Sequence, residues 1–247
     1  MNEKQKRVAQ DGKSWQKTKS EQTKTAILNA ALDCFLSIGF NNTTTEKIAK
    51  QAKVSRGAML HHFPQRLDLI RASVQHLHRK RLEAFEETLS KLNENADFTL
   101  VGEGIDAFWD QLQSPLFAVY CELLVASRTD AELKGMLAPA IRDFQTAWRE
   151  KSEGIFPDLA QSEQYGLATA LTRYLLEGIA FNAQASEGQV LNAQAKIAIE
   201  WLKSTVRDMF QDVQISKSAL TAGDHQPKQS PTSELSDGQR TENPRLV

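Results

Sequence analysis

The stretch that most constrains the fold of this chain is residues 43–63, whose pattern predicts two short helices joined by a tight turn. Thr43 and Glu46 have the spacing of a capping box, which begins a helix by satisfying backbone donors that otherwise lack partners. Ser55 is placed to begin the second helix in the same manner. The apolar spacing then assigns an inward face to both helices, made of Ile48, Ala49, Ala52, Met59 and Phe63.

The opposite face of the second helix is too polar for a helix buried in a core. It carries mostly small and polar side chains, namely Arg56, Gly57, Ala58, Leu60 and His61. Two helices arranged in this way form a helix-turn-helix, which places its second helix in the major groove of DNA. On an ordinary exposed face these residues would be solvated and nothing more, so it is the motif that favours a binding role.

These motifs are similar to those of the tetracycline-repressor (TetR) family of bacterial transcription regulators. The resemblance rests, in chain order, on Thr44-Thr45, Lys47-Ile48-Ala49, Val54-Ser55-Arg56-Gly57, His62-Phe63 and Arg66. The preceding segment 27–40 closes on Gly39-Phe40 and resembles the first helix of that family. The similarity covers roughly residues 20–72, and beyond them only the helical layout agrees with the family.

The resemblance implies a set of residues that contact DNA, and Thr44 is one of them. Positions where family members contact phosphates are occupied by Thr45, Ser55, His62 and Arg66, and positions that face bases by Arg56, Gly57, Ala58 and His61. Leu60 departs from the pattern, because the family commonly has an aromatic residue there, usually Tyr, that contacts the DNA backbone. Thr45 and Ser55 serve equally well as helix caps alone, and His62 as a packing residue.

The distribution of charge supports a nucleic-acid partner independently of the motif. The whole chain has a net charge of -1, but residues 1–80 hold 15 Lys and Arg against 6 Asp and Glu. Residues 81–247 hold 15 against 25. A basic segment joined to an acidic one is expected of a DNA-binding head on a separate regulatory body, because only the head is attracted to phosphates.

Length and composition narrow the classes of protein to which this chain can belong. A chain of 247 residues is long enough for one or two domains with a substantial core. No run approaches the roughly 18 apolar residues of a membrane span, and the polar start does not resemble a signal peptide, so we expect a cytoplasmic protein with no membrane partner. Cys34 and Cys121 lie in apolar helical patterns, which favours core packing over a disulfide. A redox-sensing role for Cys121 stays open.

Almost every periodic stretch predicts a helix and no pair of strands is evident, so the expected fold is all-α. The expected helices span about 20–38, 44–51, 55–62, 66–92, 97–113, a segment beginning at Ser114-Pro115, 130–153, 158–185 and 187–213. We divide the chain into a flexible basic arm at 1–19, a helix-turn-helix DNA-binding domain at 20–65, a helical effector-binding and dimerisation domain at 66–213, and a disordered tail at 214–247.

The last two helices carry more apolar surface than one chain's core should absorb. Paired with the same helices of a second copy they would form a four-helix bundle, and the family resemblance also implies dimerisation through its last two helices. The residues predicted at this interface are Leu171, Leu175, Trp201 and Leu202. Burial within a single chain is the alternative for each of them.

The middle helices are rich in aromatic residues, which predicts an apolar pocket for a small effector. The predicted lining is Trp109, Phe117, Tyr120, Glu122, Phe144, Trp148 and Tyr174. Ordinary core packing is the alternative for each aromatic side chain. Glu122 lies inside an apolar run, so its carboxylate needs a partner, either a ligand or a nearby residue such as Arg142 or Arg173.

Motifs for catalysis are absent from the sequence: it has no Gly-rich phosphate loop, nucleophile elbow or Cys/His cluster with metal spacing. We therefore expect neither an enzyme nor a cofactor. The patterns together favour a homodimeric, ligand-responsive repressor that a small apolar or amphipathic effector releases from a palindromic double-stranded DNA operator. The alternatives are a helical small-molecule-binding protein or enzyme with a vestigial DNA-binding head, and a protein-interaction module.

Overall fold

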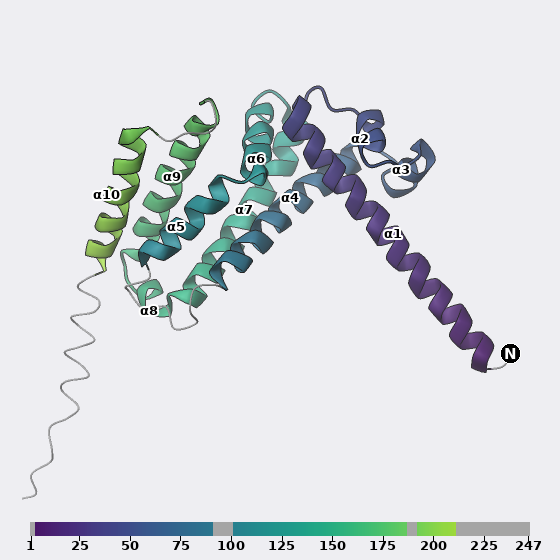
Figure 1. Cartoon of the computed structure of the whole chain (residues 1–247), viewed down its shortest axis with the longest axis horizontal. Helices are drawn as coiled ribbons and strands as arrows, with labels where there is room; N and C mark the ends of the chain where they lie inside the picture. Colours follow the sequence, from purple (N-terminus) through teal and green to yellow (C-terminus); the bar gives the residue numbers. More distant parts are fainter. Residues whose placement is uncertain (1–2, 91–100, 187–191, 211–247) are drawn as a thin grey trace, which may run out of the picture.

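The computed structural model describes residues 3–90, 101–186 and 192–210, and all regular elements within these ranges are helices. In chain order they are α1 (Glu3–Ile38), α2 (Thr45–Gln51), α3 (Arg56–His62), α4 (Arg66–Leu89), α5 (Val101–Leu112), α6 (Pro115–Ala126), α7 (Ala131–Ile155), α8 (Pro157–Ala160), α9 (Tyr165–Ala183) and α10 (Ala193–Met209). The predicted all-α fold is confirmed, with a three-helix head and a helical body (Figure 1).

The head is built on the C-terminal half of α1, which packs against α2. Gly39 follows this helix with φ 79°, a left-handed conformation that lets the chain turn sharply out of α1. Phe40 then folds back, so that its ring centroid lies 5.5 Å from that of Phe35. Ile48 of α2 and Met59 of α3 are buried in the same cluster, which confirms the predicted inward face of the two short helices.

The body begins with α4, which leaves the head and packs against α5 and α7. α6 lies against both α1 and α4 and so joins the two parts of the molecule. α9 and α10 form the end of the body farthest from α3, where α10 packs on α5 and α9 (Figure 1). One continuous buried cluster runs from Ile27 in the head to Phe210 at the end of α10.

The first helix begins earlier than predicted. Residues 3–19, expected as an arm without regular structure, continue α1 in the same helix. The absence of an apolar stripe misled the prediction, because a helix that projects beyond the body needs no buried face (Figure 1). Lys, Gln, Glu, Arg and Ala, which dominate this segment, are good helix formers. The flexibility expected for residues 1–19 remains a prediction.

The predicted helix 158–185 is interrupted. α8 ends at Ala160, and α9 begins only at Tyr165. Ser162 explains the break, because its hydroxyl accepts a hydrogen bond from the backbone N–H of Gln164 at 3.2 Å, an arrangement that competes with a continuous helix. By contrast, Pro139 lies inside α7 without ending it.

The predicted disordered tail at 214–247 lies outside the described residues, as do the start of the predicted helix 97–113 and the start of the helix 187–213. Among the helices that are described, none combines the length and apolar character needed to cross a membrane.

Candidate nucleic-acid interface and effector pocket

The first of the two short helices is capped by Thr44. Its hydroxyl accepts a hydrogen bond from the backbone N–H of Lys47 at 3.3 Å. Thr43, predicted as the cap, is instead buried, and its hydroxyl donates to the carbonyl of Gly39 at 2.7 Å. The prediction was therefore wrong by one residue, because Thr43 is held by the turn that follows α1. The pKa of Glu46 is lowered, first by its own backbone N–H and then by the Thr44 hydroxyl.

The second short helix has the predicted geometry. The Ser55 hydroxyl accepts a hydrogen bond from the backbone N–H of Ala58 at 3.1 Å, which confirms it as the cap. Arg56, Gly57 and His61 are exposed, and Leu60 is 46% exposed. A Cβ built on Gly57 would meet only the Ser55 hydroxyl, at 3.9 Å. No contact among the described residues therefore requires glycine at this position on the outward face.

The turn between these helices is strained. Lys53 has φ 55°, the left-handed region that non-glycine residues rarely adopt. The turn is held by two backbone hydrogen bonds, from the N–H of Lys53 to the carbonyl of Lys50 at 3.2 Å and from the N–H of Val54 to the carbonyl of Ala49 at 3.0 Å. Both bonds tie the turn to α2 directly before α3 begins.

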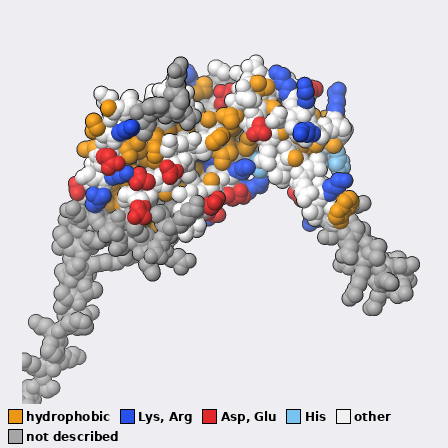
Figure 2. Space-filling view, in the orientation of Figure 1, with side chains coloured by type: hydrophobic (Ala, Val, Ile, Leu, Met, Phe, Trp, Pro, Cys, Tyr) orange, Lys and Arg blue, Asp and Glu red, His pale blue; other side chains and the backbone are white. Residues whose placement is uncertain are grey.

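The remaining predicted phosphate contacts lie around the same surface. Thr45 is half-buried in the first turn of α2, and His62 is half-buried at the end of α3. Burial, followed by the neighbouring His61, lowers the pKa of His62. The guanidinium of Arg66 is exposed at the start of α4 and lies 5.5 Å from the centre of the Phe40 ring. Figure 2 shows Lys and Arg gathered at this end of the molecule, and Asp and Glu mainly along the body.

Glu122 connects the body to the head. Its Oε1 accepts a hydrogen bond from the backbone N–H of Phe40 at 2.7 Å. A Cβ on Gly39 would lie 3.0 Å from the same oxygen, so the approach depends on glycine. The backbone N–H of Phe40 is therefore the partner of the Glu122 carboxylate, in place of the expected Arg142 or Arg173.

A second link joins α4 to α1. His76 Nε2 lies 2.8 Å from Asn29 Oδ1, and Arg79 Nη2 lies 2.6 Å from His76 Nδ1. Because the guanidinium can only donate, Nδ1 accepts, and Nε2 carries the proton that is donated to Asn29. Burial, followed by the charges of Arg79 and Lys80, lowers the pKa of His76 to about 4.

Some of the predicted effector-binding residues surround a buried arginine instead of a cavity. The guanidinium of Arg81 lies 4.3 Å from the ring centres of both Tyr120 and Phe144, and 6.0 Å from that of Phe117. His78 packs on the same rings of Tyr120 and Phe144. These cation–π contacts offset part of the cost of burying Arg81. Phe117 and Tyr120 therefore contribute to packing in this structure.

The other predicted residues are spread over the body. Trp109 is half-buried and packs against the core, whereas Tyr174 is 64% exposed on α9. Cys121 is buried, and burial is the main cause that raises its pKa to about 11. Its thiol is therefore protonated near neutral pH, which argues against an activated redox thiol. The predicted lining does not form one cavity.

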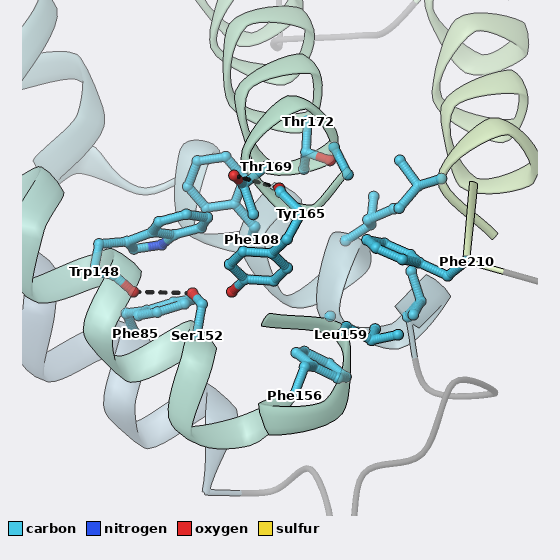
Figure 3. A pocket seen from close by; sticks show the side chains of 15 residues that line it. Phe85, Phe108, Trp148, Ser152, Phe156, Leu159, Tyr165, Thr169, Thr172 and Phe210 are labelled. Atoms are coloured by element: carbon cyan, nitrogen blue, oxygen red, sulfur yellow. Dashed lines mark hydrogen bonds between the residues drawn. The ribbon is translucent and has the colours of Figure 1, made fainter. Parts of the chain in front are cut away.

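An apolar pocket lies instead between α4, α5, α7, α9 and α10, closed at one side by α8 (Figure 3). It has a volume of about 80 Å³ and is lined by Phe85, Val101, Gly104, Ile105, Phe108, Trp148, Ser152, Phe156, Leu159, Tyr165, Ala168, Thr169, Thr172, Val206 and Phe210. Trp148 alone comes from the predicted set. The ends of helices supply Phe156 and Phe210, and an aromatic residue just beyond a helix was the signal that could have identified them.

A more open groove of about 410 Å³ runs along the outside of α7 and α9. It contains Phe144 and Trp148 from the predicted set and is basic, with Arg142, Arg149 and Arg173 along its edges. Arg149 pairs with Glu153 at 3.6 Å. Arg173 pairs with Glu177 at 3.9 Å, so most of this charge is already matched.

Exposed apolar side chains form two stripes at the end of the body. They are Leu167, Leu171, Tyr174 and Phe181 on α9, and Ile197 and Trp201 on α10, with exposed fractions from 37% to 68%. Leu171 and Trp201 from the predicted interface belong to these stripes, and Leu175 is half-buried beside them. Leu202 is 0% exposed, so its prediction as an interface residue was wrong: it faces the core of its own chain.

Comparisons with known proteins agree with this architecture. A family model described as bacterial regulatory proteins, tetR family, matches residues 27–72. An uncharacterized HTH-type transcriptional regulator of Mycobacterium tuberculosis is 26% identical over 170 residues, spanning 67% of this chain and 84% of that protein. The HTH-type transcriptional regulator UidR of Escherichia coli is 32% identical over 76 residues, which are 31% of this chain and 39% of UidR. A putative TetR-family regulator from Mesorhizobium loti has a similar fold, with a TM-score of 0.60 and 18% identity over 77% of this chain and 96% of its own.

Proposed function

The chain belongs to the TetR family of DNA-binding transcription regulators, and on that premise we propose that it is a dimeric repressor released from a palindromic operator by a small apolar or amphipathic effector. The observation that carries the proposal is the outward face of α3, which is exposed, basic at Arg56 and rigidly capped by Ser55. A helix anchored by a buried Met59 can present this face to base edges without unfolding.

In this proposal the base-facing residues are Arg56, Gly57, Ala58 and His61. Arg56 is the strongest candidate for direct readout, because a guanidinium can donate two hydrogen bonds to a guanine edge. Gly57 allows close approach, since the chain itself leaves space there. Backbone contacts are assigned to Thr44, Thr45, Ser55, Leu60, His62 and Arg66. Leu60 contributes apolar contact only, because it has no hydroxyl.

The exposed apolar stripes on α9 and α10 support dimerisation. Large apolar side chains such as Trp201, which is 58% exposed, and Ile197, which is 68% exposed, are unusual as a contiguous surface on a monomer. Two copies pairing through these stripes would bury them in a four-helix bundle. The pair would present two α3 helices to half-sites separated by about 34 Å, one turn of DNA.

The route from effector to DNA is assigned to α4. Phe85, near its C-terminal end, lines the apolar pocket, and the same helix begins at Arg66 beside the head. An effector that displaces Phe85 would tilt this 24-residue helix and change the separation of the two heads. Release then follows if the effector binds the tilted state more tightly than the DNA-binding state.

The test begins with selection of duplexes from a random-sequence DNA library by the purified full-length protein. Sequencing of the retained fragments should reveal an inverted repeat, and light scattering of the protein bound to it should give two chains per duplex. The double variant Arg56→Ala/His61→Ala is the matched control, and it should enrich no defined sequence. Equal enrichment by the parent and this variant would reject the assignment of α3 as the reading element.

A further inference from the structure

Two residues that line the apolar pocket each carry a polar atom with no hydrogen-bond partner within the described part of the chain. These atoms are the hydroxyl oxygen of Tyr165 and the indole Nε1 of Trp148, and both are shielded from solvent. Tyr165 is only 7% exposed, and Figure 3 shows its ring directed from α9 toward the α7 side, where Trp148 and Ser152 lie. Buried donors are nearly always satisfied in folded proteins, so a pair left open in one cavity indicates a missing acceptor.

The neighbouring hydroxyl groups do not supply that acceptor. Ser152 Oγ donates to the carbonyl of Trp148 at 2.9 Å, and Thr169 Oγ1 donates to the carbonyl of Tyr165 at 2.9 Å. Both hydroxyl oxygens can still accept a hydrogen bond, but neither accepts one from the Tyr165 hydroxyl or the Trp148 indole. Indole N–H is a donor only, and no acceptor reaches it within the described residues, so the site is open to an acceptor from a bound molecule.

The charge of the lining restricts the ligand further. None of the described side chains that line the pocket is charged. A carboxylate or an ammonium group placed there would lose its hydration without gaining an opposite charge, which is strongly unfavourable. The outer groove, by contrast, is lined by charged side chains, including Arg142, Arg173 and Glu177, so the two sites differ in the ligand charge that they can accept.

The size of the pocket limits the group that enters it. An apolar cavity of about 150 Å³ can hold benzene. The volume of about 80 Å³ here has room for a smaller group unless the lining moves. Phe156 is the residue best placed to move, because it lies at the junction of α7 and α8. Its ring would be 3.3 Å from a Cβ on Gly104, so glycine at that position leaves the ring its space.

We propose that the pocket binds a neutral molecule with an apolar body and an oxygen acceptor, such as a ketone, ester or ether, to which Tyr165 and Trp148 donate hydrogen bonds. This proposal names the class of ligand for the proposed function. It rests on that function in one respect, which is that the bound molecule is taken to be the effector. The apolar body occupies the space beside Phe85, Phe108 and Phe156. The acceptor oxygen accepts hydrogen bonds from the two donors that have no partner.

The first experiment compares four aromatic probes of similar size on the full-length protein, by calorimetry and thermal denaturation. They are acetophenone, ethylbenzene, benzoate and benzylamine, which provide a neutral acceptor, no acceptor, an anion and a cation. Acetophenone should bind roughly three- to tenfold more tightly than ethylbenzene, the range expected for one added hydrogen bond. It should also raise the melting temperature, whereas the two charged probes should leave it unchanged.

The second experiment repeats the comparison in variants. Tyr165→Phe removes a buried hydroxyl without a partner, so it should raise the melting temperature of the ligand-free protein and reduce the preference for acetophenone. Trp148→Phe should reduce the same preference. Trp15→Phe is the matched control for Trp148→Phe, because that ring is 63% exposed on α1, outside the pocket and the stripes, and it should change neither quantity.

The outcomes separate the ligand class from the wider function. Equal affinity for ethylbenzene and acetophenone, or a preference that survives both Tyr165→Phe and Trp148→Phe, would overturn the proposed ligand class. Preferred binding of benzoate that is lost in Arg173→Gln would also overturn it and place the ligand in the basic groove. Acceptor-selective binding that fails to release operator DNA supports the ligand class and rejects the molecule's role as effector.

Discussion

At the scale of single residues, the head separates side chains that hold the structure from side chains free to bind. Ser55 and Thr44 cap the two short helices, and Met59 anchors α3 in the core. Arg56 is exposed on the outward face of α3, and Arg66 is exposed at the start of α4. Their different positions predict different effects on DNA binding.

Arg56→Ala should weaken binding to the selected operator by about 1–3 kcal/mol and relax the preference at one base position, because a guanine contact is lost. Arg66→Ala should weaken specific and random DNA alike and reduce the salt slope by about one unit, as expected for one phosphate contact. Fluorescence anisotropy at several salt concentrations measures both. Identical small losses on both DNAs from the two variants would contradict the assigned roles.

His78 predicts a pH dependence of stability. It is 6% exposed, and burial, followed by Arg81, lowers its pKa to about 3. The unfolded chain, whose histidines titrate near pH 6.5, binds the proton more tightly than the folded chain. Keeping His78 neutral in the folded chain therefore adds fully to the free energy of unfolding above pH 6.5. That contribution is lost as pH falls from 6.5 toward 3, by an amount on the order of several kcal/mol.

His78→Leu tests this account, because it removes two ring nitrogens that have no partner within the described residues. The variant should be more stable than the parent at pH 5, and its midpoint in urea should change less between pH 7 and pH 5. The exposed His61→Leu variant is the control and should retain the parent's pH dependence. An unchanged slope in His78→Leu would assign the acid sensitivity to other groups, such as His76.

At the scale of elements, both α6 and α4 pack against the head and against the body. α6 reaches the head through Glu122, whose oxygen receives the Phe40 N–H beside Gly39. α4 reaches it directly and also lines the apolar pocket through Phe85. The strength of coupling between effector and DNA should therefore depend on the contact made by Glu122.

Glu122→Ala should destabilise the protein by about 1–3 kcal/mol, because the partly buried Phe40 N–H loses its acceptor. Glu122→Gln retains an oxygen at this position and should be close to the parent in stability, which makes it the matched control. In the alanine variant, effector binding should persist while its effect on operator affinity becomes smaller. Thermal denaturation and DNA titration with and without effector decide the matter, and full coupling in Glu122→Ala would rule out this link.

At the scale of the whole molecule, charge and apolar surface are distributed toward opposite ends. The basic head and the exposed stripes of α9 and α10 lie at the two ends of the body (Figures 1 and 2). A dimer through the stripes would leave both heads free to approach DNA. The acidic residues of the body oppose any other docking orientation, because like charges are repelled by phosphates.

The double variant Ile197→Glu/Trp201→Glu should be monomeric, because two charges would have to be desolvated without partners in the interface. Both positions are exposed in one chain, so the fold of each protomer should survive. Operator affinity should then fall to the weak level of a single head. Lys196→Glu, on another side of α10, is the control and should remain dimeric. A double variant that stays dimeric in light scattering would place the interface elsewhere.

The sequence by itself determined the features that depend on residues close together in the chain. The Ser55 cap, the inward Met59 and the outward Arg56 follow from spacing over a few residues, as does the start of α6 at Ser114-Pro115. Such signals are local because capping and helical periodicity act over one or two turns. Thr43 shows their limit, since a contact with Gly39 removed it from the capping position.

Only the tertiary structure decided which apolar faces meet each other. Trp201 and Leu202 are adjacent in one apolar pattern, yet the first is 58% exposed and the second 0%. The pocket joins Phe85, Phe156 and Phe210 from distant parts of the chain, while the predicted Phe117 and Tyr120 pack on Arg81. Periodicity assigns a side chain to a helix face, but burial is non-directional, so the choice of neighbour belongs to the packing of the helices.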